Sequence, residues 1–88
     1  MVLNTALDMV RTEVERATRL YPALNSGHEG YAVIREELDE LWDEVKKSKT
    51  SVPQSNAACV EALQVAAMAV RFALDLCDVE HAATVEKS

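Results

Sequence analysis

The chain has 88 residues, enough for one domain with a small core. Fifteen acidic residues outnumber nine basic ones, and the net charge of −6 disfavours direct binding of nucleic acid, because neutralising phosphates needs clustered cations. Thirteen alanines, with only two glycines and two prolines, favour helices over a β-sandwich or barrel. No uninterrupted apolar run reaches the ~20 residues of a membrane span, so no membrane segment is expected.

A first helix is expected over residues 4–20. Thr5 and Asp8 resemble a capping box at its start, and Pro22 ends it by disfavouring helical backbone at Tyr21. Apolar residues recur along it at spacings of three and four, which indicates one buried face. These residues are Leu3, Leu7, Val10, Val14, Ala17 and Tyr21.

A second helix is expected from residue 27 to about residue 49. Ser26 and Glu29 have the spacing of a capping box at its start. Gly30 in the first turn weakens the helix somewhat. The polar segment 48–56 contains a proline and predicts a loop.

A third helix is expected over about residues 56–78, capped by Ser55 or Asn56. Residues 79–88 are expected to form a short helical extension or a frayed tail of the same single domain. Cys59 and Cys77 are 18 positions apart in this helix, or ~27 Å at ~1.5 Å per residue, which is too far for a disulfide. We expect both to be reduced, packed thiols. Together with an N-terminus that lacks the features of a signal peptide, they indicate a cytoplasmic protein.

The third helix is apolar over most of its circumference. At about 100° per residue, its strongly polar side chains fall within one arc of ~100°. These residues are Glu61, Gln64, Arg71, Asp75 and Asp78. Seven alanines between residues 57 and 73 permit close approach of other helices. We therefore expect an all-α, three-helix chain that forms an oligomeric helical bundle, with the polar arc facing a cavity, a partner's charges or a bound ion.

The second helix carries seven acidic residues between residues 29 and 44. At the same rotation, Glu37 falls inside the apolar arc of that helix, and Glu40 and Glu44 lie at the edge of the arc. Carboxylates this close repel one another unless a cation lies among them, and Mg²⁺, Mn²⁺ and Ca²⁺ prefer carboxylate oxygens. A solvated acidic face is the alternative, and the residues alone leave these two interpretations evenly balanced.

Several other polar or aromatic side chains have both a structural and a substrate-binding interpretation. Arg71 either contacts phosphate or pairs with Asp75 or with a glutamate of the second helix, and the pairing is preferred. Lys46 and Lys47 suit the negative end of the helix dipole better than a phosphate contact. Trp42 lies on the apolar arc, where packing is preferred over stacking on a base.

The acidic motifs also resemble those of a known family. Glu36-Glu37-Leu38-Asp39-Glu40, followed after a spacer of twenty residues by Glu61-Ala62-Leu63-Gln64, is similar to the E-E-x-x-E … E-x-x-D signature of MazG-like nucleoside triphosphate pyrophosphohydrolases. The flanking sequence resembles the short, phage- and mobile-element-type members. The resemblance extends over about residues 25–77, and Gln64 departs from it because the family pattern has aspartate there.

The resemblance implies a homodimer or homotetramer that uses Mg²⁺ or Mn²⁺ to cleave a nucleoside triphosphate to the monophosphate and pyrophosphate, as in cleansing of the nucleotide pool. It implies that Glu37, Glu40 and Glu61 are metal ligands, with Gln64 in the fourth ligand position. Glu36 would support the ligands or position water. The candidate substrate contacts are Arg71, Lys47 and Trp42.

The glutamine leaves two alternatives open. Gln64 lowers the negative charge of the site and cannot act as a base, although Glu44 or Asp75 would compensate. In one alternative, the chain is a non-catalytic oligomer that binds a nucleotide or a metal. In the other, it is a helical interaction module whose acidic residues pair with a basic partner.

Overall fold

The computed structural model describes residues 1–47 and 53–77, and these form three helices. The helices are α1 (Leu3–Leu20), α2 (Gly27–Lys47) and α3 (Asn56–Leu76). The prediction of an all-α chain with three helices is therefore confirmed. Residues 48–52, which include the end of the expected second helix and most of the loop after it, lie outside the described residues, as do Asp78 and the tail 79–88. Residues 53–55 of that loop are described and are not helical, as predicted.

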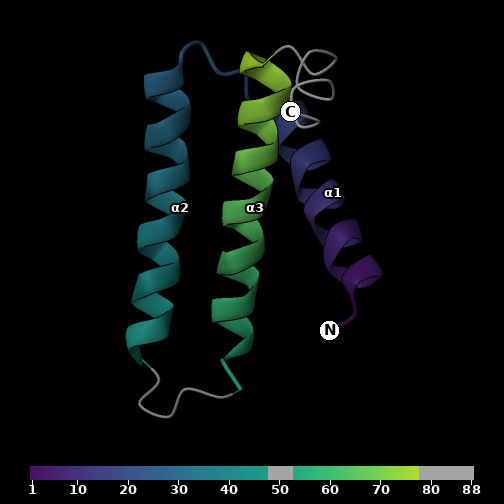
Figure 1. The fold of residues 1–88 in the computed structure, drawn as a ribbon, viewed down its shortest axis with the longest axis vertical. Coiled ribbons are helices and arrows are strands. Elements are labelled where there is room, and N and C mark those ends of the chain that lie inside the picture. Colours follow the sequence, from purple (N-terminus) through teal and green to yellow (C-terminus); the bar gives the residue numbers. More distant parts are fainter. Residues whose placement is uncertain (48–52, 78–88) are drawn as a thin grey trace, which may run out of the picture.

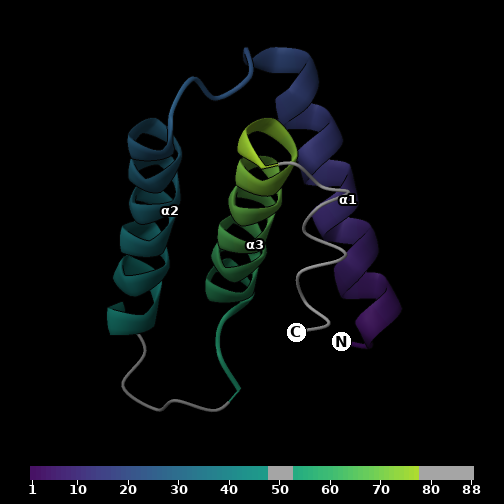
Figure 2. The same ribbon diagram turned by 45° about the horizontal axis from the view of Figure 1, so that its top comes forward.

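Helix α3 lies between the other two helices (Figure 1). α2 and α3 run antiparallel and side by side along their lengths, and this is the more extensive of the two helix pairings. α1 crosses α3 obliquely and diverges from it towards the N-terminus, as the turned view in Figure 2 also shows. The polar arc of α3 is thus placed against two helices of its own chain.

The hydrophobic core is small and lies mainly where α1 crosses α3. Its buried residues are Val14, Ala17, Ala67 and Met68, with Val10, Val33 and Ile34 packed against them. Only part of the apolar stripe expected on α1 is buried, because Leu3 and Leu7 near the diverging end are 71% and 54% exposed. A chain of this length leaves a large share of its apolar surface in contact with solvent.

The start of α1 differs from the prediction. The helix begins at Leu3 and its N-cap residue is Val2, which makes no side-chain capping bond. The predicted capping box at Thr5 and Asp8 is wrong, because Thr5 already lies in the first helical turn and an N-cap residue needs non-helical backbone. The end of α1 agrees with the prediction, since Tyr21 is extended and Pro22 follows.

The starts of α2 and α3 are capped by serine side chains, as predicted for Ser26, and of the two candidates for the third helix Ser55 is the cap while Asn56 is the first helical residue. The Ser26 hydroxyl oxygen accepts a hydrogen bond from the Glu29 amide at 3.1 Å, and the Glu29 carboxylate accepts one from the Asn25 amide at 2.7 Å. The Ser55 hydroxyl oxygen accepts from the Ala58 amide at 3.1 Å. These bonds satisfy amide groups that the first turn of a helix leaves unpaired.

Side chains of α3 pack directly against the backbone of α2 at Gly30. A Cβ atom at this position would lie 2.5 Å from the Phe72 ring and 3.2 Å from Leu76. Glycine therefore weakens the first turn of α2 but lets the α3 side chains pack directly against its backbone. This contact holds the two helices together at the end near the α1–α2 connection.

One side of α3 is exposed and carries no charge. Val60, Val70 and Leu74 are 46%, 40% and 55% exposed, and both cysteines are free thiols that lie at the surface. The prediction that Cys59 and Cys77 are packed is thus wrong for the single chain.

Helix α3 is also long and apolar enough to cross a membrane, judged by length and composition alone and within the described residues. The sequence prediction missed this because it counted uninterrupted apolar runs, which Glu61 and Arg71 divide. Only 22% of the apolar stretch is buried in the chain. Core helices of soluble proteins pass the same test, so the finding identifies a helix with an unusually large apolar surface.

Candidate metal centre

Three carboxylates meet between α2 and α3. Glu37 and Glu40 come from successive turns of α2, and Glu61 comes from the polar arc of α3. One carboxylate oxygen of each lies within 4.8 Å of the others, and we call this set the carboxylate triad. Glu37 and Glu61 are half-buried and Glu40 is exposed, so the triad is open to solvent on one side.

The triad perturbs the protonation of its own members. Burial raises the pKa of Glu37 to about 7, with further contributions from its interaction with Glu40 and from the charges of Glu61 and Glu36. Burial and the negative charges of Glu40 and Glu44 also raise the pKa of Glu61. Nearby carboxylates disfavour one another's charged forms. All three side chains of the triad are acidic, and no basic side chain of the described residues is a member of it.

The donor atoms of the triad fit a hard divalent cation. One oxygen of Glu61, Oε2, is buried and has no hydrogen-bond donor among the described residues. A buried oxygen without a donor is costly unless another group binds it. Mg²⁺ and Mn²⁺ bind carboxylate oxygens, and Mg²⁺ commonly uses one or two carboxylates with water and phosphate as its other ligands.

Two ion pairs border the open side of the triad. Lys47 lies 2.8 Å from the Glu44 carboxylate and Lys46 lies 3.2 Å from that of Asp43. Together with Glu40 and Glu61, these residues line a shallow pocket of about 520 Å³. Glu44 thus adjoins the triad, as the sequence predicted, but in the described residues it is paired with a lysine.

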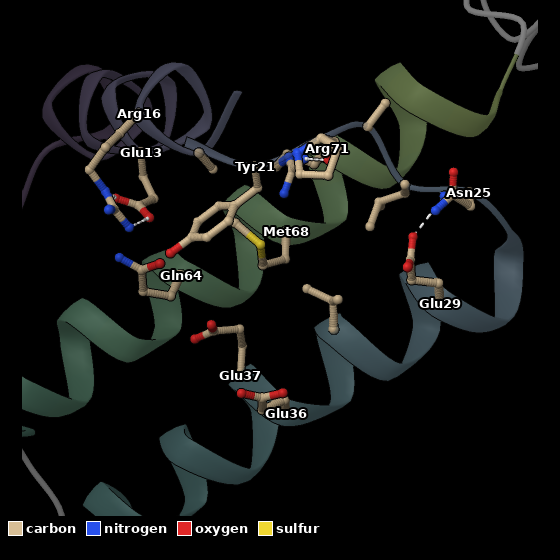
Figure 3. A pocket seen from close by; sticks show the side chains of 15 residues that line it. Glu13, Arg16, Tyr21, Asn25, Glu29, Glu36, Glu37, Gln64, Met68 and Arg71 are labelled. Atoms are coloured by element: carbon tan, nitrogen blue, oxygen red, sulfur yellow. Dashed lines mark hydrogen bonds and ion pairs between the residues drawn. The ribbon is translucent and has the colours of Figure 1, made fainter. Parts of the chain in front are cut away.

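A second, deeper cleft of about 410 Å³ is lined by α1, the α1–α2 connection, α3 and one side of α2, and we call it the α1–α3 cleft. Gln64 and Met68 of α3 line it, and Figure 3 shows the Gln64 amide lying beside Glu13 and Arg16 of α1. The Gln64 interaction contributes to lowering the pKa of Glu13, after the larger effect of Arg16. Gln64 is therefore directed toward α1, and its predicted role as a metal ligand remains a prediction.

Two acidic residues of α2 connect the cleft with the triad. Glu36 and Glu37 both line the α1–α3 cleft, and Glu37 is also a member of the triad. Glu36 adds a negative charge that raises the pKa of Glu37. The position of Glu36 is compatible with the supporting role predicted for it.

Arg71 and Asp75 form a separate cluster at the other end of α3. The Arg71 side chain is 7% exposed, its Nη2 donates to the Pro22 carbonyl at 3.0 Å, and it lies 3.7 Å from the Asp75 carboxylate. That carboxylate accepts a hydrogen bond from the Leu24 amide at 3.0 Å. The preferred structural pairing of Arg71 is confirmed, and Asp75 is engaged away from the triad.

Trp42 lies on a part of α2 that borders none of the clefts described above. Its side chain is 58% exposed, and the Lys46 ammonium lies 5.9 Å from its ring centroid. A base stacked on this ring would therefore lie outside the shallow pocket and the α1–α3 cleft. Packing against a partner remains the preferred interpretation.

The contribution of α1 to the cleft was absent from the sequence prediction. Glu13 and Arg16 form an ion pair with distances of 2.6 and 2.8 Å, and Tyr21 lies beside them. The spacing of three residues identifies such a pair on a helix. Whether this ion pair faces the cleft depends on how α1 crosses α3, and the sequence pattern of one helix does not specify that crossing.

The chain has no match among protein-family models, and no curated protein or solved structure resembles it significantly. The structure shows a small three-helix all-α domain, and membership of the MazG-like family stays a prediction from the motifs.

Proposed function

We propose that the protein is a Mg²⁺-dependent nucleotide pyrophosphohydrolase, which converts a nucleoside or deoxynucleoside triphosphate to the monophosphate and pyrophosphate. The observation that carries this proposal is the carboxylate triad across α2 and α3. The resemblance of residues 36–40 and 61–64 to the MazG-like motifs supports it. Glu37, Glu40 and Glu61 would hold the cation in this proposal, with Mn²⁺ as a substitute.

Electrostatics favour a substrate that arrives with a cation. A chain of net charge −6 repels a bare triphosphate, and the triad concentrates negative charge at one point. When bound, Mg²⁺ would bridge phosphate oxygens and lower the pKa of an attacking water. Lys46 and Lys47 border the same pocket and would contact phosphate oxygens on its outer side.

Glu36 has a supporting role in this proposal. It lines the cleft next to Glu37, and its carboxylate is a hydrogen-bond acceptor that can orient a water molecule. Arg71 is proposed to stabilise the site indirectly, because its guanidinium joins α3 to the α1–α2 connection. Its burial and pairing argue against a direct phosphate contact.

A second candidate function is supported by Gln64. Its amide lies beside α1, and a glutamine in the position of the family's aspartate removes one negative charge from the predicted ligand set. The protein would then bind a nucleotide or metal without hydrolysing it. Gaining activity through Gln64→Asp would favour this candidate, whereas activity in the unaltered protein would exclude it.

We further propose that the protein is a homo-oligomer in a reducing, cytoplasmic compartment. Tyr31, Leu38 and Trp42 of α2 are 60%, 50% and 58% exposed, and by helix geometry they lie on one face, turned away from Glu36. On α3, three of the exposed alanines lie opposite Gln64 by the same geometry. These alanines are Ala62, Ala69 and Ala73.

The face of α2 in one copy would complement the alanine face of α3 in a second copy. Large side chains on α2 would pack against the alanine surface of α3 from the other chain, and the reverse contact follows from two-fold symmetry. Trp42→Glu is expected to dissociate the oligomer in sedimentation velocity, because it would bury a charge in the contact. Ala32→Glu, at an exposed position about 80–120° around α2 from the three side chains of this face, should leave it intact.

The direct test of activity is pyrophosphate release. Purified protein with Mg²⁺ should release pyrophosphate from at least one member of a panel of canonical and modified nucleoside triphosphates, and chelation should stop the reaction. Absence of release from every member, with the oligomer intact, would overturn the proposed activity. Metal-dependent stabilisation without turnover would favour the non-catalytic candidate, and no response to Mg²⁺ would favour an interaction module.

A further inference from the structure

The α1–α3 cleft has the size and composition of a small-molecule site. Its volume of about 410 Å³ is within the usual range for ligand pockets, which combine apolar walls with a few polar groups. α1 and its C-terminal connection form one wall, α3 forms the floor, and Glu36 and Glu37 lie at the far edge (Figure 3). The cleft therefore adjoins the triad but contains different chemistry.

Its apolar part suits a flat ring. The Tyr21 ring lies beside the Met68 side chain, with its hydroxyl end toward Gln64 (Figure 3). Tyr21 is 56% exposed, so one region of its ring is available to a ligand, whereas Met68 is 7% exposed and forms part of the floor. Stacking of a heteroaromatic ring on an aromatic side chain is favourable for every nucleobase.

Its polar part suits a neutral ligand with both donors and acceptors. The Gln64 amide offers both kinds of group, and the adjacent Glu13–Arg16 pair has no net charge. Arg71 also lines the cleft, but its guanidinium is buried and bound to the Pro22 carbonyl. This composition suits a base edge better than a phosphate group.

Glu37 lies at the boundary between the two regions. A ligand whose phosphates lie at the triad would direct its remaining part along α3, past Glu37, into the cleft. We propose that the α1–α3 cleft binds the nucleobase, with Tyr21 as the stacking surface and Gln64 as the group that contacts the base edge. The identity of the ligand rests on the proposed function, whereas the location of the site rests on the cleft.

Free nucleosides test the cleft without the metal chemistry. The full chain would be titrated with ribo- and deoxyribonucleosides of each base in the presence of a chelator, and the Met68 methyl and Gln64 amide followed by NMR. The methyls of Met1 and Met9 lie outside this cleft and provide internal references. At least one nucleoside is expected to shift the Met68 and Gln64 signals saturably.

Two tyrosines provide a matched comparison. Tyr21→Ala should weaken nucleoside binding about tenfold or more, because a stacked aromatic ring is lost. Tyr31 is similarly exposed, at 60%, but lies outside the cleft, so Tyr31→Ala should leave the affinity unchanged. Gln64→Leu should change the preference among bases, and it provides a second variant that retains the Tyr21 surface.

The base-binding proposal is overturned if no nucleoside shifts the Met68 and Gln64 signals, or if Tyr31→Ala weakens binding as much as Tyr21→Ala. If the unaltered protein releases no pyrophosphate, the proposed activity fails but the base-binding proposal does not. Nucleoside binding in the presence of chelator does not require the triad. A Glu61→Gln variant that still binds the nucleoside would separate the two sites directly.

Discussion

The two charged clusters on α3 differ in whether the chain supplies both signs of charge. At one end, Arg71 and Asp75 pair with each other and with backbone groups of the α1–α2 connection. In the other direction along α3, Glu61 lies among carboxylates, with Glu37 and Glu40 in the triad and Glu44 nearby. A buried charge is tolerated when it is paired, so the first cluster is complete within the described residues, and we propose that an external cation completes the second.

This contrast distinguishes the structural role of Arg71 from the functional role that we propose for the triad on the same helix. The Arg71 cluster joins segments about 50 residues apart in the chain and thereby positions α1 against α3. At the triad, burial and then the neighbouring carboxylates raise the pKa values of Glu37 and Glu61. Groups whose pKa values are shifted next to a cleft are characteristic of functional sites, although structural networks also shift them.

The largest expected effect is on catalysis. Glu61→Gln should reduce pyrophosphate release at least about 100-fold, because the amide replaces a charged ligand for the cation. Asp39→Asn removes the same charge from an exposed position of α2 and should retain activity. Steady-state rates with Mg²⁺ would measure both, and equal losses in the two variants would contradict the special role of the triad.

The next largest effect is expected on the stability of the fold, at the cluster of Arg71 and Asp75. Arg71→Leu should lower the free energy of unfolding by about 1–3 kcal/mol, because it leaves the Pro22 carbonyl and the Asp75 carboxylate without their cationic partner. Urea denaturation would measure this change. Arg35→Ala, at an exposed arginine of α2, should change the free energy by less than about 0.5 kcal/mol. A similar loss in both variants would contradict the structural role of Arg71.

A smaller effect is expected from pH. Because the folded state raises the pKa of Glu37 from 4.5 to about 7, the folded protein binds the proton more tightly than the unfolded chain does. The corresponding stability is fully present below about pH 4.5 and is lost as pH rises through about 7. With solvent screening of this half-exposed group, the loss should be about 1 kcal/mol.

Denaturation in chelator at about pH 5 and about pH 8 would measure this loss of stability. Glu37→Gln should flatten the dependence, since glutamine does not titrate, whereas Asp39→Asn should preserve it. Added Mg²⁺ should raise the stability at the higher pH by binding the charged triad. An unchanged slope in Glu37→Gln would show that another group is responsible.

The sequence predicted the helices better than their relative placement. Ser26 and Ser55 were identified as caps because capping depends on a few consecutive residues. Thr5 was misassigned because its spacing fits a capping box, although the helix begins at Leu3. Local patterns therefore located each helix to within about two residues, which is the usual uncertainty at helix ends.

The sequence predicts the candidate site only where rotation around a single helix decides which side chains face inward. Helical rotation placed Glu37 and Glu40 inward on α2 and Glu61 on the polar arc of α3, and these three converge in the structure. Rotation alone did not reveal that Gln64, three residues after Glu61, faces α1. The direction in which α1 crosses α3 decides that contact, and it depends on packing between distant segments.

The central claim is that the triad needs a cation that the chain does not supply. Titration with Mn²⁺, followed by electron paramagnetic resonance of the free ion, measures this directly. The account predicts saturable binding to the unaltered protein and to Asp39→Asn, with loss of binding in Glu61→Gln while its helical circular dichroism is retained. Absence of saturable binding, or equal binding to Glu61→Gln and the unaltered protein, would contradict it.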